Sequence, residues 1–181
     1  VRGKPEDVKL AGQHFRTAAN ATDEIAGLAI LSELRTPERQ VAFDRFYERW
    51  HEDHLVIDHW FALQAASSLP TTLATVRKLA SHQLFSLRNP NKVWALIGAF
   101  AGSNPLVFNR PDGRGYAFVA SKVLEIDVFN PQVAARLLGT FRSWKALESA
   151  RRKLARQTLQ SVKKSHDLSR DTYEIVSKML E

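Results

Sequence analysis

One helix-start signal recurs along this sequence and constrains its fold more than any other feature. An Asn-Pro or Thr-Pro pair stands at residues 36–37, 89–90, 104–105 and 130–131. Asn or Thr suits the N-cap, and Pro suits the first helical position because the N–H that it lacks would have no partner there. The apolar residues recur with the helical period throughout, and no segment alternates as a strand does. The sequence therefore predicts helices without a β-sheet.

The helices are predicted to be short, numerous and antiparallel. We expect about eight to ten of them, joined by short polar turns. They are predicted over residues 9–19, 20–34, 37–50, 55–66, 71–82, 90–101, 115–129, 131–141, 144–164 and 169–180. Consecutive helices of this kind form an all-α superhelical array of antiparallel helix pairs, an α-solenoid of the ARM or HEAT type. The length predicts one domain over residues 1–181, with residues 1–9 as a linker or frayed entry.

The stretch from residue 89 to residue 116 is predicted to be the centre of the array. Gly98 is expected to let another helix approach closely, and Gly102 is expected at the C′ position that ends the helix. Pro111, Asp112 and Gly113 have the chemistry of a tight turn. A phosphate-binding loop is the less favoured interpretation of the same residues.

The net charge of +7 comes from one segment. Residues 142–164 hold eight basic residues and one acidic residue, whereas the rest of the chain has 18 of each. A solvated helix face or a contact between domains is the favoured interpretation. A nucleic-acid interface or an anionic membrane surface is less favoured, because no aromatic or glycine-rich pattern interleaves the charges. We therefore predict neither nucleic acid nor membrane as a partner.

Catalytic and metal-binding motifs are missing from the sequence. It has no cysteine, no Gly-x-Ser-x-Gly elbow, no Walker loop and no His-Glu-x-x-His pair. Acidic and histidine side chains gather at residues 51–59, but four positions after His51 stands Leu55. His54 and Asp58 are one helical turn apart and could share a cation, although surface histidines at a helix turn are the favoured interpretation. We predict no metal site and no catalytic residue in this chain.

Several features indicate a piece of a longer intracellular protein. The sequence begins with Val1, and its single methionine is Met179. It has no signal-peptide pattern and no apolar run near the roughly 20 residues of a membrane helix. The absence of cysteine fits a reducing compartment. These features predict a cytoplasmic location.

Four motifs, in order, resemble one family. The stretches FYERWHEDHLVIDHWFALQA, NPNKVWALIGAFAGSNP, GYAFVASKVLEIDVFNPQVAARL and LSRDTYEIVSKML are similar to the C-terminal helical domain of bacterial aminopeptidase N, also called alanyl aminopeptidase. This family belongs to the gluzincin zinc metallopeptidases. The resemblance runs from about Leu10 to the end of the chain and implies an all-helical superhelix.

The resemblance also implies what the whole enzyme does and which part of that function belongs to this domain. The whole enzyme would be a membrane alanyl aminopeptidase-type hydrolase that releases N-terminal amino acids from peptides. Zinc would be its cofactor, with all ligands outside this chain, so the chain alone would be inactive. Its partners would be peptide substrates and the catalytic domain of the same polypeptide. This domain would cap the catalytic domain and form the channel through which substrates enter.

Two residues are the candidates for the wall of that channel. Arg136 matches an arginine of the family and is expected to meet peptide carboxylates or carbonyls. A salt bridge to Glu125 or Asp127 is the alternative. Trp94 stands where family members often have a basic residue, which puts a substrate role for that position in doubt. Like the other tryptophans, Trp94 is most simply a residue of the core.

A second function hypothesis comes from a different class. The chain could be a stand-alone helical-repeat binding module whose ligand is a nucleic acid or an acidic protein. A reading frame that continues upstream into a His-Glu-x-x-His motif favours the peptidase, and a start codon just before Val1 favours the binding module.

Overall fold

The computed structural model describes residues 4–181, and every regular element in that range is helical. The α-helices are α1 (Pro5–Thr17), α2 (Ala21–Ser32), α3 (Pro37–Trp50), α4 (Val56–Ala66), α5 (Thr72–Leu79), α6 (Pro90–Val93), α7 (Ala99–Ser103), α8 (Pro105–Phe108), α9 (Arg114–Asp127), α10 (Pro131–Leu138), α11 (Ser149–Lys163) and α12 (Arg170–Leu180). A π-helix, η1 (Trp94–Gly98), joins α6 to α7. Two 3₁₀ turns, η2 (Gly139–Phe141) and η3 (Trp144–Ala146), follow α10. The prediction of an all-helical chain is confirmed.

The Asn-Pro signals start helices as predicted. The side chains of Asn104 and Asn130 each accept a hydrogen bond from the N–H three residues later, at 3.1 and 3.2 Å. Asn89 accepts from the N–H of Asn91 at 3.0 Å. Thr36 also precedes a helix, although its side chain makes no capping bond. These caps satisfy N–H groups that the first helical turn leaves without partners.

Several predicted boundaries are wrong. The long helix predicted to begin at about residue 144 or 147 begins at Ser149, after the separate 3₁₀ turn η3. Helix α1 begins at Pro5, so the linker expected over residues 1–9 does not hold for residues 5–9, and residues 1–3 lie outside the described range. Pro5 at the first position, with Glu6 and Asp7 in the first turn, is itself a start signal. Gly102 lies inside α7 rather than at C′, because Asn104 ends α7 while it caps α8.

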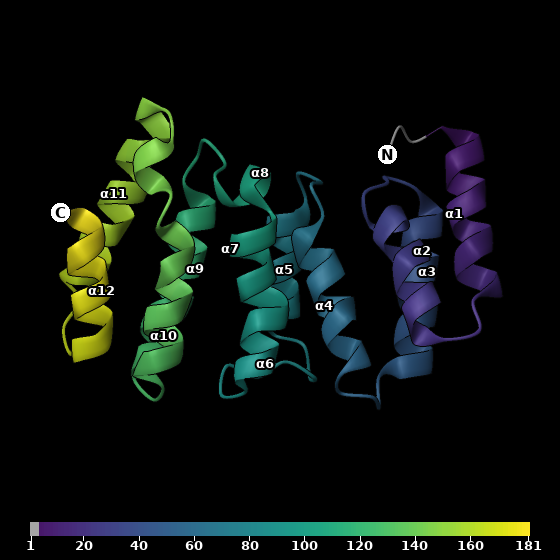
Figure 1. Ribbon diagram of the computed structural model, residues 1–181, viewed down its shortest axis with the longest axis horizontal. Coiled ribbons are helices and arrows are strands. Elements are labelled where there is room, and N and C mark those ends of the chain that lie inside the picture. The colour runs from purple at the N-terminus through teal and green to yellow at the C-terminus, as the bar shows by residue number, and fades with distance from the viewer. Residues whose placement is uncertain (1–3) are drawn as a thin grey trace.

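The helices form an array that is two helices deep. Figure 1 shows them side by side along the long axis, from the N-terminus on the right to the C-terminus on the left. Consecutive helices pack as pairs, for example α1 with α2, α9 with α10 and α11 with α12. Contacts between non-consecutive helices link α2 to α4, α4 to α7 and α10 to α12 in one layer, and α1 to α3 and α9 to α11 in the other. This is the helical-repeat architecture that was predicted.

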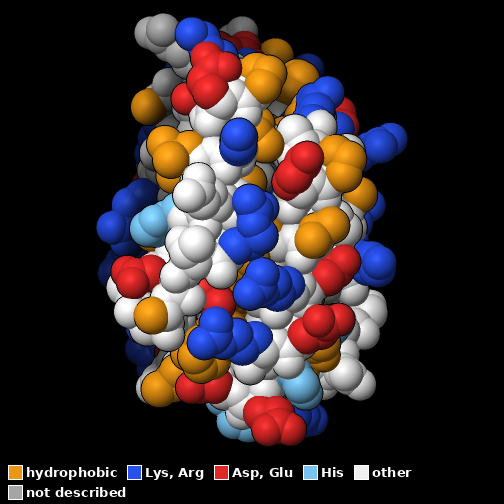
Figure 2. All heavy atoms as spheres, turned by 90° about the vertical axis from the view of Figure 1, so that its right-hand side faces the viewer, with side chains coloured by type: hydrophobic (Ala, Val, Ile, Leu, Met, Phe, Trp, Pro, Cys, Tyr) orange, Lys and Arg blue, Asp and Glu red, His pale blue; other side chains and the backbone are white. Residues whose placement is uncertain are grey.

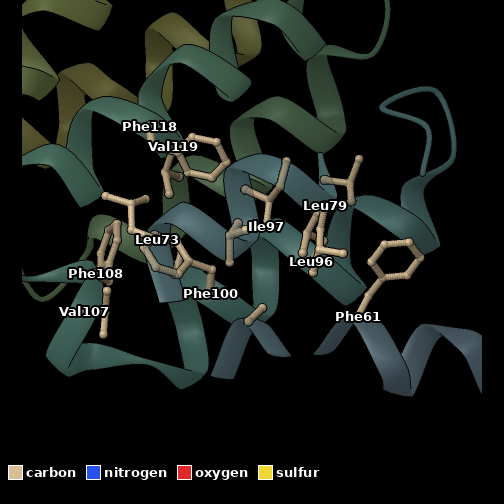
Figure 3. Close-up of a cluster of buried hydrophobic side chains, with 14 of the residues drawn as sticks. Phe61, Leu73, Leu79, Leu96, Ile97, Phe100, Val107, Phe108, Phe118 and Val119 are labelled. Atoms are coloured by element: carbon tan, nitrogen blue, oxygen red, sulfur yellow. The ribbon is translucent and has the colours of Figure 1, made fainter. Parts of the chain in front are cut away.

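A continuous apolar core lies between the layers. Figure 3 shows its centre, where side chains from α4, α5, η1, α7, α8 and α9 meet. The ring centroid of Phe108 lies 5.2 Å from that of Phe141 and 5.3 Å from that of Tyr116. Gly115 allows this packing, since a Cβ there would lie 2.2 Å from the carbonyl oxygen of Phe108. Gly113, with φ of 68°, makes the turn before α9 as predicted.

Buried polar side chains fix how neighbouring helices meet. Glu24 is 1% exposed and accepts hydrogen bonds from Arg49 and Trp50, each at 2.6 Å. Asp127 accepts from Ser169 and Thr172 and so ties the end of α9 to the start of α12. Because a buried carboxylate without donors is costly, these bonds select one packing of the helices.

A helix that crosses a membrane must be both long and apolar. Within residues 4–181, none has both the length and the apolar character that crossing a bilayer requires.

The first prediction concerns the buried ion pair between α4 and α6. Lys92 Nζ lies 2.5 Å from Asp58 and also donates to the carbonyl oxygen of His54 at 3.2 Å. The Lys92→Met variant leaves Asp58 without its cation, so we expect a loss of roughly 3 kcal/mol in the free energy of unfolding, measured by urea denaturation. Adding Asp58→Leu should recover part of the loss.

Arg170→Met is the matched control for Lys92→Met. It breaks the exposed pair between Arg170 and Glu174, which solvent screens. Its urea midpoint should be almost unchanged. If both variants unfold at the same urea concentration, the ion pair of Lys92 has no structural importance.

The second prediction concerns His82, which lies against the rings of Tyr47, Trp60 and Phe61 at centroid distances of 5.4, 5.4 and 5.8 Å. Burial, and secondarily the charge of Lys78, lower the pKa of His82 from its ordinary value of 6.5. The unfolded chain therefore takes up a proton first as the pH falls, which favours unfolding. We expect stability to be full above about pH 6.5 and to fall below it.

The His82→Gln variant tests this origin. The drop in thermal midpoint between about pH 7.5 and pH 5.5 should be smaller in His82→Gln than in the native chain. His166→Gln, which removes an exposed histidine, should keep the native drop. Equal drops in all three proteins would contradict the assignment to His82.

Candidate functional site

The structure brings together the two residues that the sequence singled out separately. The guanidinium of Arg136, on α10, lies over the indole ring of Trp94, on η1, with its central carbon 4.7 Å from the ring centroid. Arg136 is exposed and Trp94 is half-buried. A cation above an indole face is an attractive arrangement, worth about 0.5–1 kcal/mol at an exposed site.

The helix that carries Trp94 is built to hold its ring in this place. Asn89 and Pro90 start the helix, which then widens into the π-helix η1. Gly98 follows Trp94 by one turn, and a Cβ on Gly98 would lie 2.4 Å from the Trp94 ring. The expectation that Gly98 admits another helix is therefore wrong: it makes room for the tryptophan of its own helix. Short π-helices of this kind often occur at functional sites.

Arg136 is free of carboxylates. Within residues 4–181 its guanidinium makes no ion pair and no hydrogen bond. Glu125 pairs with Lys122 at 2.7 Å, and Asp127 accepts from Ser169 and Thr172. The salt bridge considered as the alternative role for Arg136 is therefore not formed.

This geometry sets what the pair can recognise. A guanidinium stacked through its face keeps the N–H groups of its edge available for hydrogen bonds. Such an edge suits a carboxylate, which it binds with two parallel bonds, or a peptide carbonyl. The indole adds an apolar surface next to that edge. The pair thus offers hydrogen-bond donors beside an apolar surface, and neither side chain is a nucleophile or a general base.

Two carboxylates of the histidine-rich segment at residues 51–59 have partners within the protein. Asp53 accepts hydrogen bonds from the N–H groups of Leu55 and Val56, and so starts α4. Asp58 pairs with Lys92. Within the described residues, no three or more histidine, cysteine or acidic side chains are grouped so that they could hold a metal ion.

The Pro-Asp-Gly loop is a self-contained turn. Asp112 accepts from the Arg114 N–H at 3.1 Å and from the Arg110 side chain at 2.7 Å. The donors of the loop therefore bond to the Asp112 carboxylate and are not left for a phosphate. This favours the turn interpretation over phosphate binding.

Sequence reasoning named both members of the pair but missed their contact and the π-helix. One local signal was available: Trp94 and Gly98 are four residues apart, a spacing that places them on the same face of a helix. The contact with Arg136 has no such signal, because 42 residues separate it from Trp94 in the sequence.

Comparison with protein families and curated proteins gives consistent matches. A family model described as a domain of unknown function (DUF3458_C) with ARM repeats matches residues 1–181. Aminopeptidase N of Escherichia coli (strain K12) is 39% identical over 171 residues, which is 94% of this chain and 20% of that protein. Aminopeptidase N of Caulobacter vibrioides is 37% identical over 167 residues, 92% of this chain and 19% of that protein. The chain thus spans about a fifth of the length of these relatives.

A solved aminopeptidase structure is also similar to this chain. The crystal structure of Legionella pneumophila aminopeptidase A in complex with aspartic acid superimposes with a TM-score of 0.90 at 32% identity. The match covers 96% of this chain and 20% of that one.

The third prediction tests how Trp94 is held. Gly98→Ala should destabilise the chain by about 1–3 kcal/mol, because the new methyl group displaces the Trp94 ring. Gly102→Ala, one turn later with nothing within 4 Å of the added Cβ, should instead stabilise it by about 0.5–1 kcal/mol through helix propensity. Urea denaturation measures both changes. Stabilisation by both substitutions would show that Gly98 has no role in seating the ring.

Proposed function

The chain belongs to the DUF3458_C family of ARM-repeat domains and is homologous to the C-terminal region of aminopeptidase N, and from this we propose that it is the C-terminal domain of a zinc-dependent aminopeptidase. The whole enzyme would release N-terminal amino acids from peptides. The observation that carries the proposal is the similarity to aminopeptidase N along 94% of the chain.

Zinc does not fit the residues of this chain. The sequence lacks the His-Glu-x-x-His pair, and residues 4–181 offer no alternative cluster of ligands. We therefore assign the zinc, which would activate the attacking water, to the part of the enzyme outside this chain. What remains for this domain is to bind and orient the substrate and to exclude bulk water from the reaction.

We propose that Arg136 and Trp94 line the substrate channel. The free edge of the Arg136 guanidinium would bind a peptide carboxylate or carbonyl downstream of the scissile bond. Trp94 would fix the orientation of Arg136 and offer an apolar surface to a neighbouring peptide side chain.

The N-terminal end of the array is the face that we assign to the rest of the polypeptide. Terminal repeats of solenoids usually have a polar outer face, yet Leu10 and Val41 are 68% and 65% exposed here. An apolar pocket of about 590 Å³ lies between α1 and α2. Figure 2 shows this face, with hydrophobic side chains on both sides of a line of Lys and Arg. Burying such a surface would stabilise contact with a neighbouring domain.

The fourth prediction uses the longer enzyme. Arg136→Ala should lower kcat/KM for a tetrapeptide by about tenfold or more, since a charge-assisted hydrogen bond is lost. It should change kcat/KM for a single-residue chromogenic amide little, because that substrate ends before Arg136. Trp94→Ala should show the same pattern more weakly.

Two controls make this result interpretable. Lys122→Ala, which removes a partly buried cation of the neighbouring helix α9, should leave kcat/KM for both substrates unaffected. The 181-residue chain alone should show no turnover. Equal losses on both substrates in Arg136→Ala would contradict a role in the channel, and zinc-dependent turnover by the chain alone would contradict the proposed division of labour.

The cytoplasmic location stays a prediction. The stand-alone binding module is the less favoured hypothesis, because in the curated relatives the matching sequence is about a fifth of a longer aminopeptidase N.

A further inference from the structure

A second surface is left without a role by the proposed function. The basic segment of the sequence forms η3 and α11, at the C-terminal end of the array (Figure 1). Apart from Arg151, five of its cations lie on α11 or at its C-cap: Arg152, Lys153, Arg156, Lys163 and Lys164. We call these five residues the basic stripe. Because Arg152, Arg156 and Lys163 are spaced i, i+4 and i+11, they form one line of roughly 16 Å along the helix.

The basic stripe has no counter-charge of its own. Within residues 4–181, the one ion pair made by a basic residue of this segment joins Arg151 to Glu148, and Arg151 is outside the stripe. Arg152 and Arg156, one turn apart, repel each other. Elsewhere the chain balances its basic and acidic residues. The positive field is therefore local, and an acidic partner would relieve the repulsion.

A hollow with a mixed polar and apolar lining lies beside the basic stripe. Arg152, Lys153 and Arg156 share a pocket of about 490 Å³ with Trp144 and Leu180. Its remaining lining residues are Lys145, Ser149 and Glu181. Tyr173 is 48% exposed on the neighbouring helix, and Lys163 Nζ lies 5.4 Å from its ring centroid. Arginine and aromatic residues are enriched at protein interfaces, and Leu180 adds an apolar contact among the cations here.

We propose that the basic stripe and this hollow form a docking surface for an acidic, amphipathic segment of a partner protein. Carboxylates of the segment would pair with Arg152, Arg156 and Lys163, and an apolar side chain would enter the hollow. A nucleic acid fits less well, because its phosphate backbone offers no apolar group for Leu180. The inference is independent of the aminopeptidase assignment.

A peptide-binding experiment tests the surface. The probe is a dye-labelled synthetic peptide of about 16 residues in which Glu recurs every fourth position beside Leu, titrated with the chain by fluorescence anisotropy at low salt. The reversal variant carries Arg152→Glu, Arg156→Glu and Lys163→Glu. The control carries Lys9→Glu, Arg35→Glu and Arg45→Glu, three exposed cations at the other end of the array. Circular dichroism confirms that both variants are folded.

The control changes the net charge by the same amount as the reversal variant, so the two variants separate local from global electrostatics. We expect the reversal variant to bind the peptide about tenfold more weakly or worse, and the control to stay within about twofold of the native chain. Equal weakening in both would mean that only net charge attracts the peptide and would overturn the proposal.

Two other outcomes would also overturn it. One is that the native chain does not bind the peptide at all. The other is that duplex DNA of about 20 base pairs binds more tightly than the peptide and loses binding in the reversal variant, which would make the basic stripe a nucleic-acid interface.

Discussion

The helices described within residues 4–181 are at best marginally stable alone, so the fold depends on the core that the two layers share. The longest helix described has 15 residues, near the lower limit for an isolated helix in water. Phe100, Phe108, Tyr116 and Phe141 connect α7, α8, α9 and η2 through ring contacts, so the central helices are fixed together. Each helix pair buries its apolar stripe only when the next pair is in place.

This dependence on tertiary packing explains which helix boundaries could be predicted from the sequence. Caps such as Asn104 and Asn130 act within four residues, and so their helix starts were predicted correctly. The ends of helices depend on what packs there: Gly102 looked like a terminator, yet the helix continues to Ser103 because Asn104 both ends it and starts the next. The start of α1 at Pro5 does have a local signal, namely Pro at the first helical position followed by Glu6 and Asp7.

In the candidate site, too, the sequence indicates local features but not the contacts between distant segments. Arg136 and Trp94 were each identified from a resemblance, whereas their contact needs α10 to lie beside η1, which only the tertiary structure determines. Gly98 has its role through Trp94, a neighbour in its own helix, and the spacing of the two residues could have indicated it. At residues 51–59, where the sequence left a shared cation as the less favoured interpretation, Asp53 starts a helix and Asp58 forms an ion pair.

The central claim is that this array is a wall of the channel along which an aminopeptidase receives its substrate. A structure of the longer enzyme with a bound, uncleavable peptide tests it most directly. The account predicts that the peptide passes over Trp94 and that Arg136 donates hydrogen bonds to its carboxylate or a carbonyl. A peptide bound with Arg136 and Trp94 facing away from it, on the outer surface of the enzyme, would contradict the account.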